Sequence, residues 1–238
     1  MNVNAQAVVH KKVAAKPKTT AKTTAPVVLA TANDSFSYAI GLNLAYDLKQ
    51  RNVDEVNANL VKKGIEDAMQ GKATGTLTDQ QVQMTIQQRL KMASDSKLNA
   101  EKAKGAAFLA ANGKRAGVTT LPDGVQYEIL TKSDSIASPT EKDTVVANYV
   151  GMLMDGTEFD NSYKRNKPIT IGVTSVIRGW TEILQKMHVG DKYKVYIPSD
   201  MAYGDRGAGN GAIPGGATLI FEIDLIQIIP AATTTPSK

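Results

Sequence analysis

The chain has 238 residues, 42% of them hydrophobic, and contains no cysteine. The absence of cysteine excludes disulfides and thiol chemistry. No run of about 18 apolar residues is present, which excludes a membrane-spanning helix. A chain of this length holds one large domain or two modest ones, and we expect two.

The formal net charge of +5 comes from the N-terminus. Residues 1–33 contain five lysines and no acidic residue, so the other 23 basic and 23 acidic residues cancel. The Ala, Lys, Thr and Pro composition of this stretch predicts a flexible, solvated tail. The alternative is phosphate binding on nucleic acid or an anionic membrane, but we expect no nucleic-acid partner.

The N-terminal stretch also indicates whether the chain carries a secretory signal. A secretory signal needs an apolar run of about 7–15 residues, and the first 30 positions offer only Val27-Val28-Leu29-Ala30. No intact signal peptide is therefore expected in this chain. Ala5-Gln6-Ala7 resembles the small-residue end of a cleaved signal.

A first helix is predicted after Asn33-Asp34-Ser35, which offers an N-cap. It is apolar over much of its circumference, so it should pack against partners, including a second copy of the chain. Its two apolar stripes contain Phe36, Ile40, Leu44 and Leu48, and Tyr38, Leu42 and Tyr46.

Two more helices follow in the pattern. A start signal at 52–55 and apolar residues from Val56 to Met69 predict a helix that ends at Gly71. Thr78 and Gln81 form a capping box that opens a third helix, which runs to about Asn112. That helix would have about 34 residues and a length of about 50 Å. The alternative is that 94–99 forms a loop between two shorter helices.

After Gly117 the pattern becomes that of an antiparallel sheet with one short helix at about 176–186. Strands are predicted at 125–130, 144–152, 192–198 and 218–229, with a hairpin turn at Asp155-Gly156. Alternation places Tyr193, Val195 and Ile197 on one face and Tyr196 on the other.

Common catalytic motifs are weak or absent. His10 and His188 form no pair or triad, and we expect no metal and no cofactor. Residues 207–211 are rich in glycine like a phosphate-binding loop, but Pro214 and a strand follow instead of a helix. Glu158 and Asp160 share a strand face as in some hydrolases, but Glu158 has the surroundings of a solvated rim residue, so hydrolysis is disfavoured.

Several motifs resemble, in order and spacing, the FK506-binding (FKBP) type of peptidyl-prolyl cis-trans isomerase across about 118–230. They are YVG (149–151), DGTEFD (155–160), RNKP (165–168), VIRGW (176–180), PSDMAYG (198–204) and IPGGATLIF (213–221). The helical half, with FSYAIG (36–41) and KGAAFL (104–109), is similar to the dimerisation region of the Mip/FkpA branch found in bacterial envelopes.

The resemblance implies a proline pocket and a role for each residue in it. Trp180 would be the floor, with walls from Phe159, Tyr149 and Phe221; the Ile177 N–H and the Tyr203 hydroxyl would hold substrate carbonyls. Asp160 would be oriented by Tyr149 and Arg165 beside the rotating bond. The full set is Asp160, Tyr149, Tyr203 and Trp180 as catalytic residues, and Phe159, Arg165, Ile169, Val176, Ile177, Ile213 and Phe221 as substrate-binding residues.

Two features depart from the family pattern. Ile169 stands where the family often has an aromatic residue, and the loop 205–212 differs from common patterns. Another interpretation is that Trp180, Phe221, Val176 and Phe159 are simply core. Their combination with Asp160 and Arg165 favours a pocket.

We therefore expect an α+β protein with an N-terminal all-α dimerisation region, a long connecting helix and an FKBP-like antiparallel sheet wrapped around one short helix. Its parts would be a basic tail (1–33), a helical region (34–115), an isomerase domain (116–231) and a C-terminal tail (232–238). The expected function is isomerisation of Xaa-Pro bonds in unfolded or partly folded proteins, with chaperone activity. The alternative is a dimeric holdase-type chaperone or peptide-binding protein in which isomerisation is secondary.

By the same resemblance, the partners would be proline-containing unfolded clients, a second copy bound through 34–112, and ligands of the FK506 or rapamycin type. The location would be the bacterial envelope, in the periplasm or attached to the outer membrane.

Overall fold

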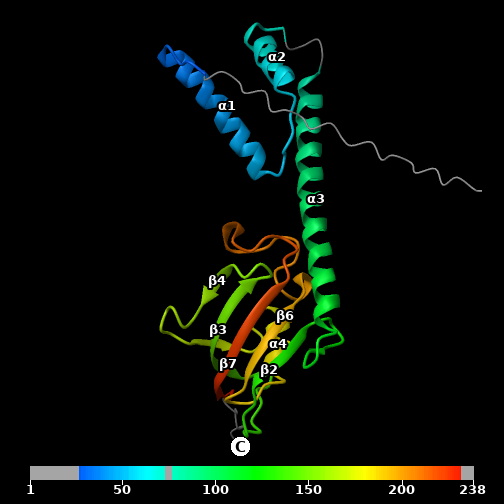
Figure 1. The fold of residues 1–238 in the computed structure, drawn as a ribbon, viewed down its shortest axis with the longest axis vertical. Coiled ribbons are helices and arrows are strands. Elements are labelled where there is room, and N and C mark those ends of the chain that lie inside the picture. Colours follow the sequence, from blue (N-terminus) through cyan, green and yellow to red (C-terminus); the bar gives the residue numbers. More distant parts are fainter. Residues whose placement is uncertain (1–26, 73–76, 232–238) are drawn as a thin grey trace, which may run out of the picture. The chain divides into compact units, whose positions relative to one another are not determined.

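The computed structural model describes residues 27–72 and 77–231 (Figure 1). The chain divides into two units, one ending at Asp47 and the other beginning at Leu48. The helices are α1 (Ala32–Gln50), α2 (Ala58–Met69), α3 (Asp79–Asn112) and α4 (Arg178–Leu184). The strands are β1 (Thr119–Thr120), β2 (Gln126–Thr131), β3 (Thr144–Leu153), β4 (Glu158–Asn161), β5 (Ile169–Gly172), β6 (Lys192–Ile197) and β7 (Leu219–Ile229).

The starts of α1 and α2 differ from the prediction because other side chains satisfy the free N–H groups. At α1, the Asp34 N–H donates to Thr31 Oγ1 (3.1 Å) and the Thr31 N–H donates to the Asp34 carboxylate (2.9 Å), so Thr31 makes the cap. At α2, Asn57 Oδ1 accepts from two amides of the first turn. Asn52 instead has a φ of 62°, so the predicted start at 52–55 is wrong.

The long helix α3 agrees with the prediction. The capping box of Thr78 and Gln81 is present, and the helix runs unbroken for 34 residues. The alternative of a loop at 94–99 is therefore wrong. Lys91 and Asp95 lie one turn apart and form an ion pair (2.8 Å) across the start of that segment.

The sheet has the order β1-β2-β6-β7-β3-β4, with β5 pairing β3, and every pairing is antiparallel. The four predicted strands are confirmed to within two residues at each end, and so is the hairpin turn, where Gly156 has a φ of 85°. The prediction missed β1, β4 and β5, which have two to four residues each. Such short, mixed segments have too few residues to show a period of two.

One face of the sheet packs on α4 and holds the core. The buried residues there come from alternate positions of β6 and β7, as predicted for Tyr193, Val195 and Ile197. A Cβ on Gly179 would lie 2.4 Å from Ile197 Cγ2, so glycine lets α4 approach β6 closely. Tyr196, predicted for the outer face, is nevertheless buried (3% exposed) because α3 covers it, with Phe108 and Tyr196 ring centroids 5.8 Å apart.

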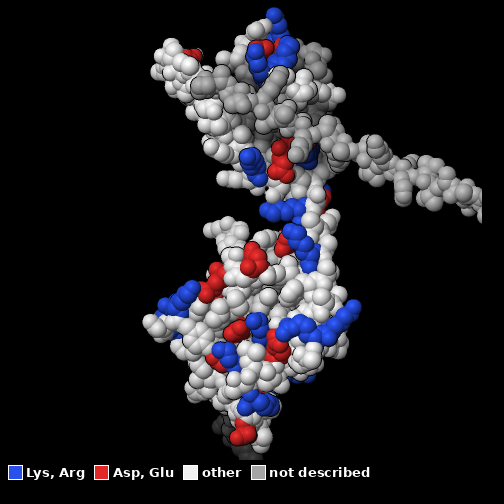
Figure 2. All heavy atoms as spheres, viewed as in Figure 1, with Lys and Arg blue, Asp and Glu red and all other residues white. Residues whose placement is uncertain are grey.

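Charge on the surface agrees with a neutral folded part. On the face shown in Figure 2, basic and acidic side chains are interspersed over the sheet. The lysine-rich stretch 11–22, on which the nucleic-acid alternative depended, lies outside the described residues. None of the described helices is long and apolar enough to cross a membrane.

Candidate active site

The helix α4 begins beneath an apolar pocket with a volume of about 400 Å³. Ile177 caps α4 in an extended conformation (φ −59°, ψ 147°), so the helix starts later than predicted and Val176 and Ile177 lie in the segment that enters it. The pocket is lined by Tyr149, Phe159, Asp160, Ile169, Ile171, Ser175, Val176, Ile177, Trp180, Tyr203 and Phe221.

Four aromatic rings set the shape of the pocket. Trp180 lies edge-on to both Tyr149 (5.2 Å between centroids, 88°) and Phe221 (5.4 Å, 88°). Phe159 lies edge-on to Phe221 (5.7 Å, 83°). Edge-to-face contacts of this kind fix ring orientation beyond simple burial, so the rings form rigid surfaces.

Glycine at position 151 makes room for two of these rings. Gly151 of β3 pairs with Asp160 of β4 and Phe221 of β7. A Cβ there would lie 2.6 Å from Phe159 Cε2 and 2.9 Å from Phe221 Cε1. The YVG motif thus places Tyr149 in the pocket and leaves space for the two phenylalanines next to it.

One carboxylate enters this apolar setting. The Tyr149 hydroxyl donates to Asp160 Oδ2, and Arg165 donates from Nη1 to Asp160 Oδ1 and from Nη2 to the Tyr149 hydroxyl (3.0 Å). The Arg165 guanidinium also lies 5.7 Å from the Tyr149 ring centroid. These contacts fix both oxygens of Asp160.

Burial and hydrogen bonding act in opposite directions on Asp160. Burial raises the pKa of its carboxyl, but the hydrogen bonds from Tyr149 and Arg165 outweigh it and hold that pKa below the ordinary 3.8. Burial and the bond to Asp160 raise the pKa of Tyr149. At neutral pH Asp160 is therefore ionised and Tyr149 remains a hydrogen-bond donor.

Several donors at the pocket make no hydrogen bond within the described part of the chain. Among the described residues, no hydrogen bond uses the Ile177 N–H or the Tyr203 hydroxyl. Burial, then the charge of Asp160, raises the pKa of Tyr203, so this hydroxyl also keeps its proton. The Trp180 Nε1 is buried without a hydrogen-bond partner.

The structure brings together all the predicted site residues except two. Arg165 does not line the pocket and acts on Asp160 from outside it, and Ile213 is buried (6% exposed) in the loop after β6. Sequence reasoning missed Ile171 and Ser175. Ile171 shares a face with Ile169 on β5, and the alternation in ITIG is the signal that could have found it.

Ser162 is a further residue of the site that the sequence analysis did not predict. Its side chain is fully buried, accepts a hydrogen bond from the Tyr149 N–H (2.8 Å) and donates to Asn148 Oδ1 (2.8 Å). These bonds tie the end of β4 to β3 and so hold Asp160 opposite Tyr149. The other carboxylate on β4, Glu158, is exposed and paired with Lys164 (2.8 Å).

Within the ranges 27–72 and 77–231, no group of three or more His, Asp or Glu side chains is arranged to hold a metal ion. The site thus consists of aromatic rings, one oriented carboxylate and free donors that include the Ile177 N–H and the Tyr203 hydroxyl.

The site is a ring-lined apolar pocket on an antiparallel sheet that packs on one short helix. Residues 136–226 match the family model described as FKBP-type peptidyl-prolyl cis-trans isomerase, and residues 33–129 match the model of the domain amino terminal to it. The chain belongs to the FKBP-type peptidyl-prolyl cis-trans isomerases.

Similar proteins cover most of the chain. It is 42% identical to the "Outer membrane protein MIP" of Legionella longbeachae, over 86% of this chain and 89% of that protein. It is 37% identical to the "Peptidyl-prolyl cis-trans isomerase Mip" of Coxiella burnetii, over 88% of this chain and 92% of that one. The crystal structure of FkpA from Escherichia coli superposes with a TM-score of 0.65 and 31% identity, covering 86% of this chain and all of the other.

Proposed function

We propose that the pocket above α4 binds the proline ring of an Xaa-Pro segment and lowers the barrier to rotation about its peptide bond. The observation that carries this assignment is Asp160, a single ionised carboxylate fixed by Tyr149 and Arg165 at the edge of a pocket of edge-on aromatic rings. In this assignment Trp180 is the floor, and Phe159, Tyr149 and Phe221 are the walls.

The chemistry needs no nucleophile and no proton transfer. The barrier of about 18–20 kcal/mol comes from the double-bond character of the C–N bond, which is lost when the bond twists. The twisted amide is less polar than the planar one, so a dry aromatic pocket binds it better than the ground state. Each tenfold increase in rate needs about 1.4 kcal/mol of this preference.

Two of the free donors suit the backbone on either side of the rotating bond. The Ile177 N–H and the Tyr203 hydroxyl would hold carbonyl oxygens of the bound chain, so that the bond rotates between fixed ends. Asp160 would lie beside the carbonyl of the rotating bond and keep its charge throughout.

The test uses three single variants of the full chain on a proline tetrapeptide. Trp180→Leu and Asp160→Asn should each lower the cis/trans rate at least tenfold, about 1.4 kcal/mol of barrier, with native circular dichroism. Glu158→Gln is the matched control, because it neutralises the other carboxylate of β4, and should retain full turnover. Full turnover in both test variants would sink the assignment.

The pocket also suggests ligands of the FK506 or rapamycin type. The chain has one tryptophan, and it lies in the pocket, so intrinsic fluorescence reports occupancy directly. We expect FK506 to change this emission saturably and to inhibit turnover at the same concentrations. A ligand that changes neither would contradict the proposal.

The helical region (34–115) is proposed to be a dimerisation region that presents two isomerase domains (116–231). Support comes from α1, in which no residue is buried. Its large apolar side chains are 38–65% exposed: Phe36, Tyr38, Ile40, Leu42, Leu44 and Tyr46. Apolar surface of this extent needs a partner, and a second copy of α1 offers a matching one.

The dimer is tested by sedimentation. Ile40→Glu places a charge in the apolar groove lined by Phe36, Ile40 and Leu44, and it should convert a dimer to a monomer. Ile136→Glu makes the same change at a 93% exposed position of the isomerase domain; it is the matched control and should remain dimeric. A wild-type chain that sediments as a monomer would overturn the proposal.

A chaperone activity is the second candidate function, and the exposed apolar side chains of α2 favour it: Leu60, Ile65 and Met69 are 54–85% exposed. If the helical region holds unfolded clients, Trp180→Leu should still suppress aggregation of an unfolded client while its turnover is lost. Loss of both activities in this variant would leave isomerisation as the single function. The clients are proposed to be proline-containing unfolded chains.

We also propose an envelope location, periplasmic or attached to the outer membrane, on the grounds that the Legionella longbeachae relative is named as an outer membrane protein. Fractionation of the producing cells should recover the protein with the envelope. Recovery in the cytosol would contradict this.

A further inference from the structure

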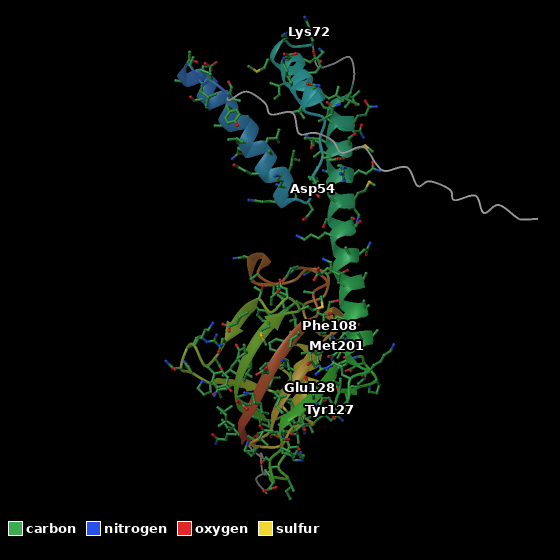
Figure 3. All side chains as sticks on the ribbon, viewed as in Figure 1. Asp54, Lys72, Phe108, Tyr127, Glu128 and Met201 are labelled. Atoms are coloured by element: carbon green, nitrogen blue, oxygen red, sulfur yellow. The ribbon has the colours of Figure 1, made fainter. Side chains whose placement is uncertain are left out.

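The C-terminal part of α3 is fixed to the isomerase sheet by buried polar contacts. Asn112 Nδ2 donates to Gln126 Oε1 (2.9 Å), and Gln126 Nε2 donates to the Leu109 carbonyl (2.9 Å). Both side chains are at least 95% buried. The Phe108 ring also packs on the Tyr196 ring, with centroids 5.8 Å apart, and Figure 3 labels Phe108 on the part of α3 that lies beside the sheet. These contacts hold the last turn and a half of α3 against the sheet.

Two turns earlier the same helix reaches the loop that follows β6, residues 199–216. A Cβ on Gly216 would lie 2.9 Å from Leu98 Cδ1, 3.1 Å from Lys102 Cγ and 3.2 Å from the Leu98 carbonyl oxygen, so the loop backbone rests directly on α3. Lys102 also forms an ion pair with Asp205 of the loop. Gly216 is buried by this contact.

The contact point on the loop is bonded to the segment that carries Tyr203. The Gly216 N–H donates to the Gly204 carbonyl (2.9 Å), and the Gly204 N–H donates to the Ser199 carbonyl (2.7 Å). Gly204 directly follows Tyr203, which lines the pocket. The bonds from Gly216 to Gly204 and from Gly204 to Ser199 therefore hold the segment that contains Tyr203.

The loop itself is poorly suited to hold this shape alone. Its glycines at 204, 207, 209, 211 and 216 have φ between 59° and 95°, and glycine loses more conformational freedom on folding than any other residue. The tip is closed by reciprocal backbone bonds between Ala208 and Ile213 (3.0 and 3.1 Å). The loop, with the residue that follows it, also buries Met201, Ile213 and Ala217 in the core, and α3 contacts its base at Gly216.

We propose that Leu98 and Lys102 of α3 are positioning residues of the isomerase site: by bracing Gly216 and Asp205 they hold Tyr203 over the pocket. This rests on the role proposed above for the Tyr203 hydroxyl. Leu98 is the main contact, because the Lys102–Asp205 pair is largely exposed (44% and 62%) and such pairs contribute little by themselves. The connecting helix is in this way part of the catalytic unit, although it does not line the pocket.

The test uses Leu98→Ala in the full chain, with Leu90→Ala as the matched control on the same helix and Leu98→Met as the conservative variant. Two quantities are measured: hydrogen exchange of the Gly216 and Gly204 amides, and KM and kcat separately on a proline tetrapeptide. For Leu98→Ala we expect exchange at these amides to be about fivefold or more faster and KM to rise about threefold or more with little change in kcat. Leu98→Met and Leu90→Ala should behave like the wild type.

A second pair of variants tests the ionic part. Lys102→Glu places like charges together and should shift exchange and KM in the same direction by a smaller factor, and adding Asp205→Lys should restore both.

The brace is overturned if Leu98→Ala and Leu90→Ala give the same exchange and the same KM, or if exchange rises while KM does not. If the proposed function itself is wrong, a different result is expected: Trp180→Leu then keeps its turnover on the proline tetrapeptide. Failure of the brace leaves Trp180→Leu inactive.

Discussion

Gly151 offers the sharpest test of how the sheet forms the pocket, and the perturbation is Gly151→Ala. The added methyl group would lie 2.6 and 2.8 Å from Phe159 Cε2 and Cζ and 2.9 Å from Phe221 Cε1. Ordinary contact begins at 3.4 Å, so Phe159 must move by about 0.8 Å. Phe221 is buried on the core side and has less freedom, so Phe159 is the ring that should shift.

Overpacking of this kind costs about 1–3 kcal/mol. For a domain of this size, 1 kcal/mol lowers Tm by roughly 4 °C, so we expect a decrease of roughly 4–12 °C by calorimetry. Turnover on a proline tetrapeptide should fall as well, because Phe159 is a wall of the pocket. The matched control is Gly64→Ala on α2, where nothing lies within 4 Å of the added atom, and where alanine favours the helix by about 1 kcal/mol.

The double variant Gly151→Ala with Phe159→Leu separates stability from activity. Leucine lacks the two ring atoms nearest the new methyl group, so much of the lost stability should return. The wall is then missing its ring, so turnover should stay low. Wild-type Tm and wild-type turnover in Gly151→Ala would refute the reasoning.

Three further outcomes are expected. Gly179→Ala should lower the Tm measured by calorimetry, because the added methyl group overpacks against Ile197 at a cost of about 1–3 kcal/mol. Adding Ile197→Ala should relieve part of this strain. If the single and the double variant melted at the same temperature, the close approach of α4 to β6 would be contradicted. Because the pKa of Asp160 lies below 3.8, its stabilising effect is fully present above the unfolded pKa of about 3.9 and is lost as pH falls through the folded pKa. The value of kcat/KM should thus be constant between about pH 5 and 8 and fall in more acidic buffer. A decrease that already begins near pH 6 would count against the hydrogen bonds from Tyr149 and Arg165 to Asp160. Thr78→Ala should remove the cap on Gln81 at a local cost of about 1 kcal/mol, visible as faster hydrogen exchange of the first turn of α3, and unchanged exchange would show that the cap is dispensable.

Local patterns were enough for much of the fold. The capping box at Thr78 and an uninterrupted run of helix-favouring residues predicted α3 over its full length, because both signals lie within the segment that they describe. The alternation on β6 predicted that Tyr193, Val195 and Ile197 enter the core. The start of α2 was misplaced because Asn52 and Asn57 are equally good caps in isolation, and the backbone turn at Asn52 decides between them.

The sequence by itself determined the fold class, the long helix and most of the residues that line the pocket, because motif order and side-chain period are properties of the chain. Only the tertiary structure decided how those residues act on each other. The bonds of Arg165 and Tyr149 to Asp160, the buried Ser162 that holds β4 to β3, and the contact of Leu98 with Gly216 join segments that are distant in sequence. Such contacts arise from the strand order and from the seating of α3 on the sheet, and no local pattern encodes either.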